Sequence, residues 1–425
     1  MTAAAALGRR LLPMLAALAI GGFALSLAPR EALGSPWVLV VLAAGAVAWV
    51  ARGPLDVRRD DVLPAIAVLL SAFGLATIAR LSPELARRQE AWLAVSLGLV
   101  VLVGPAFDRF RRLAAYKYVW VLGAIVLFAL VALFGQEVNG AKLWIRVGSV
   151  EYEPVEIIKL FIVLFMAAYL AETADVLAAA RWWSFRANAK YLGPLFLGWG
   201  ASMAILVFER DIGMATLLLA TFVAMLYVAT RRVDLIAGGA VLFGVAVWWA
   251  IRHYPYVVAR FAAWRNPFAD PLGSGYQSLQ GLFSLAAGGL FGTGYGLGHP
   301  DLIPAAATDY IYASWSEEFG ALGGLVIVGA FLILLRRAFA SAQAQPDLYA
   351  KLLATGLTAT LGVQVFIIVG GVVGLFPLTG ITLPFVSYGG SSLLANFLLV
   401  ALVWAVGSER LEKPVVDLKA DLHRS

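Results

Sequence analysis

Hydrophobic residues along the chain are grouped into long runs that short charged segments separate. A helix that crosses the hydrocarbon core of a bilayer needs about 20 apolar residues. The pattern predicts twelve such helices, near 11–28, 36–51, 62–79, 91–107, 118–134, 155–171, 191–208, 212–230, 234–251, 317–335, 352–374 and 389–408. We therefore expect an all-α polytopic membrane protein.

The composition supports this fold class and excludes several kinds of site. Hydrophobic residues make up 61% of the chain and charged residues 14%, whereas about a quarter of a soluble domain is charged. The chain has no cysteine, which excludes disulfides and thiol chemistry. The three histidines, His253, His299 and His423, are too scattered to indicate a zinc site.

Lysine and arginine predict the topology. With both termini in the cytoplasm, most of the 32 basic residues fall in cytoplasmic segments, as the positive-inside rule requires. The net charge of +6 then reflects topology and attraction to membrane lipids, and no nucleic-acid partner is expected. Arg9 and Arg10 before an apolar run also resemble a signal peptide, but an uncleaved first helix is the preferred interpretation.

This topology places four segments outside, namely 135–154, 208–211, 252–316 and 375–388. The segment 252–316 is far longer than the other loops, which is typical of a functional loop. Within it, SLQGLFSLAAGGLF predicts a helix or a re-entrant segment lying at the membrane interface, and GTGYGLG predicts a flexible backbone. The segment 375–388 is uncharged but contains Pro, Gly and Ser, so we expect a packed, polar-lined break between two helices.

Two charged groups near the first outer loop have alternative interpretations. Trp144 lies between Lys142 and Arg146, either as an interfacial aromatic with snorkelling cations or as part of a binding site. Glu156 and Lys159 are spaced to pair on the first turn of a helix. They form either a structural ion pair or the charged floor of a cavity.

Carboxylates mark two further helix starts. In FERD, Asp211 is expected to cap the following helix, while Arg210 could hold a phosphate. In ATDYIYASWSEEFG, a helix starting with Thr308 as N-cap would place Asp309 and Glu317 near one face, with Glu318 pointing away. A carboxylate in the first turn would also complement the helix dipole.

These stretches together resemble the SEDS family (shape, elongation, division and sporulation). The matching motifs are NGAKLWI from Asn139, PVEIIK from Pro154, RDIG from Arg210, YQ from Tyr276, GTGYGLG from Gly292, TDYIYA from Thr308, EEFG from Glu317 and PLTGITLPFVSYGGSS from Pro377. The resemblance covers about 60–410. Arg210 stands where many members have proline, and Ile368 where asparagine is common.

The resemblance implies a bundle of ten core transmembrane helices, to which this chain adds two at its N-terminus, as in RodA-type members. The corresponding division is an N-terminal extension over 1–59, a glycosyltransferase core over 60–410 with the extracytoplasmic loop 252–316, and a cytoplasmic tail over 411–425.

The resemblance also implies an activity. Family members polymerise lipid II into peptidoglycan glycan strands on the outer face of the bacterial cytoplasmic membrane, together with a class B penicillin-binding protein that cross-links them. Carried onto this chain, the resemblance implies that Asp309 is the essential catalytic aspartate and that Trp144 is a second position important for activity. The candidate substrate-binding residues are Trp144, Lys142, Arg146, Glu156, Lys159, Arg210, Glu317, Ser387 and Tyr388.

Inverting glycosyl transfer suits this arrangement. A general base at Asp309 would activate the acceptor hydroxyl for attack on the anomeric carbon. Arg210, Arg146 or Lys142 would stabilise the undecaprenyl pyrophosphate leaving group, and a divalent cation, Mg²⁺ or Mn²⁺, is an open alternative. The rival hypotheses are a lipid II flippase, which would call for charges along a path through the helices, and a non-catalytic scaffold.

Overall fold

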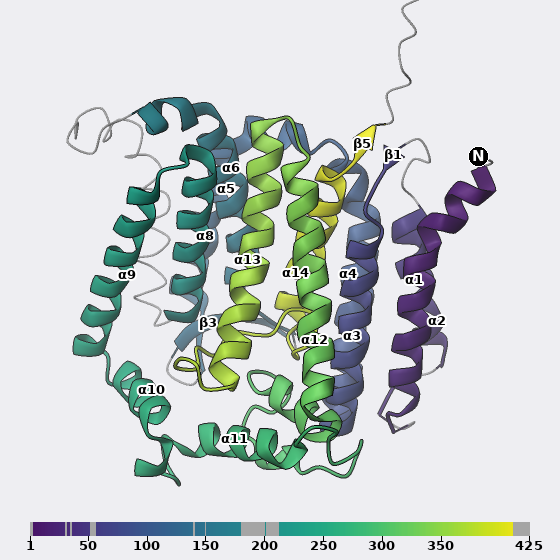
Figure 1. Ribbon diagram of the computed structural model, residues 1–425, viewed down its shortest axis with the longest axis vertical. Coiled ribbons are helices and arrows are strands. Elements are labelled where there is room, and N and C mark those ends of the chain that lie inside the picture. The colour runs from purple at the N-terminus through teal and green to yellow at the C-terminus, as the bar shows by residue number, and fades with distance from the viewer. Residues whose placement is uncertain are drawn as a thin grey trace, which may run out of the picture.

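The computed structural model describes residues 3–29, 32–34, 36–51, 57–138, 141–148, 150–179, 200 and 212–410. The helices of this part run side by side as a bundle (Figure 1). Eight of them are long and apolar enough to cross a membrane, and three shorter apolar helices accompany them. Every predicted span except 191–208 corresponds to a helix, and 191–208 lies outside the described residues.

The bundle is built from the helices α1 (Ala3–Ser26), α2 (Pro36–Ala51), α3 (Val62–Leu81), α4 (Pro83–Phe107), α5 (Lys117–Phe134), α6 (Val155–Ala179), α8 (Ile212–Thr230), α9 (Val233–His253), α12 (Ile311–Gln343), α13 (Leu348–Val372) and α14 (Gly390–Val406). Helices α3, α6, α13 and α14 are buried over most of their length. By contrast, α5 and α9 expose many large apolar side chains, as helices do that face lipid.

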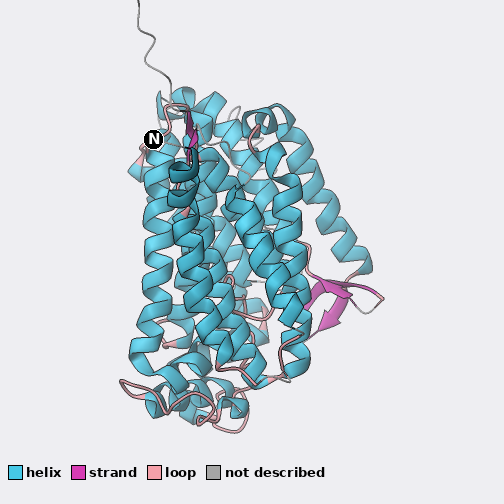
Figure 2. Ribbon diagram, turned by 90° about the vertical axis from the view of Figure 1, so that its right-hand side faces the viewer, coloured by secondary structure: helices cyan, strands magenta, loops and turns pink. Residues whose placement is uncertain are grey.

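Two small sheets depart from the all-α expectation. Strands β2 (Gln136–Val138), β3 (Ala141–Val147) and β4 (Val150–Tyr152) form an antiparallel sheet in the order β2-β3-β4, which projects from the side of the bundle (Figure 2). Strand β1 (Val57–Arg58) pairs antiparallel with β5 (Glu409–Arg410). Both sheets lie outside the spanning helices, so the membrane part is α-helical.

One end of the bundle gathers basic residues that the sequence assigns to the cytoplasm. Their ion pairs are Arg10 Nε–Asp61 Oδ2 at 3.4 Å, Arg59 Nη2–Asp108 Oδ1 at 2.9 Å and Arg337 Nη1–Asp60 Oδ1 at 2.8 Å. The β1–β5 sheet lies at the same end (Figure 1). The three ion pairs tie α1, α3 and α12 to their neighbours there.

The opposite end carries α10 (Pro255–Arg265) and α11 (Tyr276–Gly288), which lie across the bundle (Figure 1). The helix predicted within 252–316 is therefore confirmed. Short 3-10 turns at Pro267–Ala269 and Pro300–Leu302 complete this segment, and a further one at Phe110–Tyr116 precedes α5.

The loop after α11 is joined to the start of α12 by backbone hydrogen bonds. Thr293 N donates to Glu317 O at 2.9 Å and Gly294 N to Glu318 O at 3.0 Å. These carbonyls are free for the loop because Gly320, with φ of 70° and ψ of −175°, interrupts the helix just after them. Only glycine adopts that conformation without strain. The first turns of α12 thus form one unit with α11 and its loop.

The predicted break between α13 and α14 is confirmed, because the intervening residues are non-helical and those over 383–387 are buried. Two glycines let neighbouring segments approach closely. A Cβ on Gly390 would lie 2.1 Å from the Trp92 ring, and one on Gly74 would lie 2.2 Å from the carbonyl oxygen of Val386. The segment between α13 and α14 therefore packs tightly against α3 and α4.

Candidate active site

Asp309 lies in a turn before α12, not in its first helical turn. The expectation that Thr308 caps the helix is wrong, because α12 begins at Ile311 and its N-cap is Tyr310, which makes no side-chain capping hydrogen bond. Hydrogen bonds from the backbone N–H groups of Thr308 and Tyr310 to the carbonyl of Ala305, at 3.1 and 3.3 Å, close this turn instead. The carboxylate of Asp309 therefore does not lie in the first turn of α12.

The break between α13 and α14 holds this turn from one side. Ser387 Oγ donates to Thr308 O at 2.6 Å, and Tyr388 N donates to Ala307 O at 2.8 Å. Gln89 of α4 fixes the break in turn, since its Nε2 donates to Ser387 O at 3.2 Å and its Oε1 accepts from Gly389 N at 3.2 Å. Ser387 is only 3% exposed, and its hydroxyl binds a backbone carbonyl.

Arg260 of α10 approaches Asp309 from the other side. Its Nη1 donates to Thr379 O at 2.8 Å. A Cβ placed on Gly380 would lie 3.3 Å from Arg260 Nη2 and 3.7 Å from Asp309 Oδ2. The carboxylate and the guanidinium therefore both lie beside Gly380, and the positive charge of Arg260 acts on Asp309.

The environment of Asp309 suits a proton acceptor. Burial raises the pKa of its carboxyl to about 6, although a hydrogen bond with Thr308 and the positive charge of Arg260 act in the opposite direction. A general base works best when its pKa is near the working pH. Near neutral pH, Asp309 is ionised and yet more basic than an exposed aspartate.

Glu317 and Glu318 are structural neighbours of this turn. Glu317 accepts hydrogen bonds from Ser284 Oγ and from His299 N, the latter at 2.7 Å, so it joins α11 and the following loop to α12. Glu318 pairs with Arg80 of α3, with 3.3 Å between Nε and Oε1. Glu318 therefore ties α12 to α3. Glu317 is 5% exposed and has a structural role in these contacts.

Glu156 and Lys159 form the predicted ion pair on the first turns of α6. Lys159 is fully buried and Glu156 is 2% exposed. Lys159 Nζ also donates to Gln364 Oε1 at 2.9 Å and to Asn396 Oδ1 at 3.4 Å. The pair therefore ties α6 to α13 and α14 in the protein interior, which favours the structural interpretation over the floor of an open cavity.

Arg146, one of the other candidate cations, is paired within the β2-β3-β4 sheet. Trp144 is half-buried and Arg146 exposed on β3, and Arg146 pairs with Glu151 across β3 and β4. Lys142 lies on the same strand. Arg210 and Asp211 lie outside the described residues, so the phosphate-binding and capping predictions for them stay predictions.

Arg260 is a residue near Asp309 that sequence reasoning missed. It belongs to the segment 252–316, beside other aromatic and basic residues, and no spacing marks it. Within the described residues, no group of three His, Asp or Glu side chains could hold a metal ion.

Comparisons with known proteins agree with this description. The family model of the FtsW, RodA and SpoVE "Cell cycle protein" family matches residues 62–412. Peptidoglycan glycosyltransferase RodA of Mycobacterium bovis is 38% identical over 392 residues, which are 87% of this chain and 83% of that protein. Stage V sporulation protein E of Bacillus subtilis is 35% identical over 66% of this chain and 75% of its own length.

Solved structures show the same fold. A chain of a peptidoglycan synthase complex that coordinates polymerization and crosslinking superposes with a TM-score of 0.65 at 27% identity, covering 82% of this chain and 97% of that chain. The crystal structure of Thermus thermophilus rod shape determining protein RodA gives a TM-score of 0.58 at 28% identity, covering 82% and 96%.

Proposed function

The chain belongs to the FtsW, RodA and SpoVE family, and on that premise we propose that it is a peptidoglycan glycosyltransferase which polymerises lipid II at Asp309. The observation that carries the proposal is the placement of this carboxylate. It lies in a turn held by Ser387 and Tyr388, it has a pKa of about 6, and it faces Arg260 across Gly380.

In the proposed reaction, Asp309 accepts the proton of the acceptor sugar hydroxyl. The oxygen of that hydroxyl forms a bond to the anomeric carbon of the donor. The bond from that carbon to the pyrophosphate breaks, and undecaprenyl pyrophosphate leaves with the electron pair. Among the described residues, Arg260 is a cation placed to stabilise the negative charge that develops on the leaving oxygens, since it lies near Asp309. It replaces Arg146 in this role, because Arg146 is paired with Glu151.

Membrane orientation and partner complete the proposal. As the chain is a multi-pass membrane protein, the clustering of basic residues at the far end of the bundle supports a cytoplasmic location for that end. Asp309 then faces outward, where flipped lipid II is displayed. The likeness to a synthase complex that coordinates polymerization and crosslinking supports a class B penicillin-binding protein as partner.

Polymerisation of fluorescent lipid II by the purified full-length protein, with its cognate transpeptidase present, tests this function. We expect Asp309→Asn to lower the rate at least about a hundredfold, the usual contribution of a general base. Asp301→Asn, at an exposed aspartate of the same loop, is the matched control and should retain activity. Equal rates for all three proteins would exclude Asp309 as base, and an inactive wild type would exclude the polymerase.

A further inference from the structure

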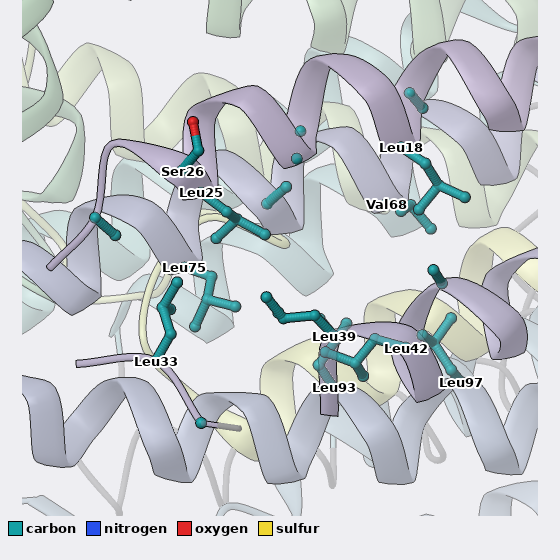
Figure 3. A pocket seen from close by; sticks show the side chains of 17 residues that line it. Leu18, Leu25, Ser26, Leu33, Leu39, Leu42, Val68, Leu75, Leu93 and Leu97 are labelled. Carbon is teal, nitrogen blue, oxygen red and sulfur yellow. The ribbon is translucent and has the colours of Figure 1, made fainter. Parts of the chain in front are cut away.

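The two N-terminal helices enclose a cavity against the core. Its volume is about 670 Å³, and its lining comes from α1, α2, α3, α4 and the α1–α2 connection. Figure 3 shows leucine and valine side chains entering it from all sides, among them Leu18, Leu25, Leu39, Leu42, Val68 and Leu93. Among the described residues of the lining, Ser26 alone has a polar side chain.

Small residues create the space. Ala17, Gly22 and Ala43 belong to the lining, and a Cβ on Gly22 would have no atom within 4 Å. A void of this size costs stability when it is empty, because its lining atoms lose their contacts. Water would not compensate for that loss, since an apolar cavity offers it no hydrogen-bond partners.

The cavity reaches from one end of the N-terminal helices to the middle of the bundle. Along α1 it extends from Ala17 to Ser26, which is about 13 Å at the helical rise of about 1.5 Å per residue. On α3 and α4 its lining lies midway along the helices, at Val68 and Leu75 and at Leu93 and Leu97. The α1–α2 connection lies at the end of the bundle where α10 and α11 lie (Figure 1). Since one leaflet contributes about 15 Å of hydrocarbon, one acyl chain that enters from the side of Asp309 can lie along the cavity.

Two charged residues of α4, Arg87 and Glu90, lie near the α1–α2 connection, where the headgroup of a bound lipid would lie. Glu90 of α4 is buried, and both of its oxygens accept from the N–H of Gly34, at 2.9 and 3.0 Å. Arg87, one turn before Glu90, is exposed and close enough to act on its charge. Arg87 comes six residues before Leu93, about 9 Å nearer this end of α4 at about 1.5 Å per residue, and a long arginine side chain can extend along the surface of a helix. A phosphate beside Arg87 would complement this positive charge.

We propose that this cavity binds one acyl chain of a phosphate-bearing bilayer lipid, with Arg87 beside the phosphate. The lipid completes the packing between the N-terminal helices and the core. This site is separate from the turn of Asp309 and does not depend on the proposed function.

Photolabelling tests the proposal on the full-length protein in nanodiscs that contain phosphatidylglycerol with a diazirine at the end of one chain. Adducts are mapped by mass spectrometry at Leu97, which lines the cavity and is 2% exposed, and at Leu15, which is 52% exposed to the bilayer. Gly22→Leu/Ala43→Leu fills the cavity. Gly98→Leu, at an exposed glycine of α4 outside the lining, is the matched control.

We expect the ratio of Leu97 to Leu15 adducts to fall about tenfold in the filled variant and to stay unchanged in the control. Labelling of Leu97 no stronger than that of Leu353, which is fully buried in α13, would overturn the proposal. So would unchanged labelling after filling, or protein cross-links in place of lipid adducts. A diacylglycerol with the same chain should label less strongly, and equal labelling would exclude the part assigned to Arg87.

A second measurement covers the case in which filling alters folding. In delipidated detergent, added phosphatidylglycerol should raise the Tm of the wild type and of Gly98→Leu by about 2–4 °C. The filled variant should start at a Tm no lower than that of the wild type and gain nothing from the lipid. An equal gain in all three proteins would show that the lipid acts elsewhere.

Discussion

Ser387 donates a 2.6 Å hydrogen bond from its hydroxyl to the carbonyl of Thr308, the residue before Asp309. The two residues are far apart in the chain, and the bond joins the break between α13 and α14 to the turn that carries the proposed base. The position of Asp309 therefore depends on a segment that has no charge of its own.

Ser387→Ala is expected to lower kcat about tenfold while KM changes little, because a small displacement of a catalytic group is costly. Steady-state lipid II polymerisation measures both constants. Ser71→Ala is the matched control, since Ser71 is equally buried but bonds only to Ala67 O within α3. A similar loss in both variants would show a general packing effect.

The rate should depend on the ionisation of Asp309. Since burial raises its pKa to about 6, kcat should rise with pH through about 6 and level off above it, where the carboxylate is ionised. Arg260 lowers this pKa, so Arg260→Gln should move the acid limb to higher pH as well as reducing the rate. An acid limb that stays in place in this variant would contradict the electrostatic effect of Arg260 on Asp309.

Gly380→Ala should impair catalysis more than stability. The added Cβ would crowd Arg260 Nη2 at 3.3 Å and approach Asp309 Oδ2 at 3.7 Å. Gly374→Ala is the control, because Gly374 has the same φ of +79° and no atom within 4 Å of the added Cβ. Both variants should lose about 1–2 kcal/mol of unfolding free energy through backbone strain. Equal polymerisation rates for the two would exclude crowding at the site.

The buried pair of Glu156 and Lys159 should be structural. Lys159→Met leaves the carboxylate uncompensated and should lower the free energy of unfolding by about 3–5 kcal/mol. Glu156→Met/Lys159→Met removes both charges and should recover much of the stability and, with it, polymerase activity. Thermal unfolding and the polymerisation assay measure the two effects.

A double variant that folds stably but remains inactive would restore the alternative in which this pair forms part of the cavity floor. Arg88→Met is the control for loss of a cation, since the pair of Arg88 with Glu84 is exposed on both sides and surface pairs contribute little.

Much of the membrane architecture was predictable from the sequence, because the bilayer imposes a minimum length on each apolar run. The spans from 62–79 to 155–171, the ion pair of Glu156 with Lys159 and the break before Gly390 are all found in the structure. The outer sheet was not predicted, since its strands are short and gain their stability from pairing across 136–152.

The sequence alone determined that the chain is a polytopic membrane protein, and its motifs singled out Asp309. Tertiary structure decided what surrounds that residue. The turn before α12, the support from Ser387 and the approach of Arg260 all join segments far apart in the chain. Apolar periodicity reports how each helix meets the membrane, whereas these polar contacts arise only when separate segments pack together, and no local pattern encodes such distances.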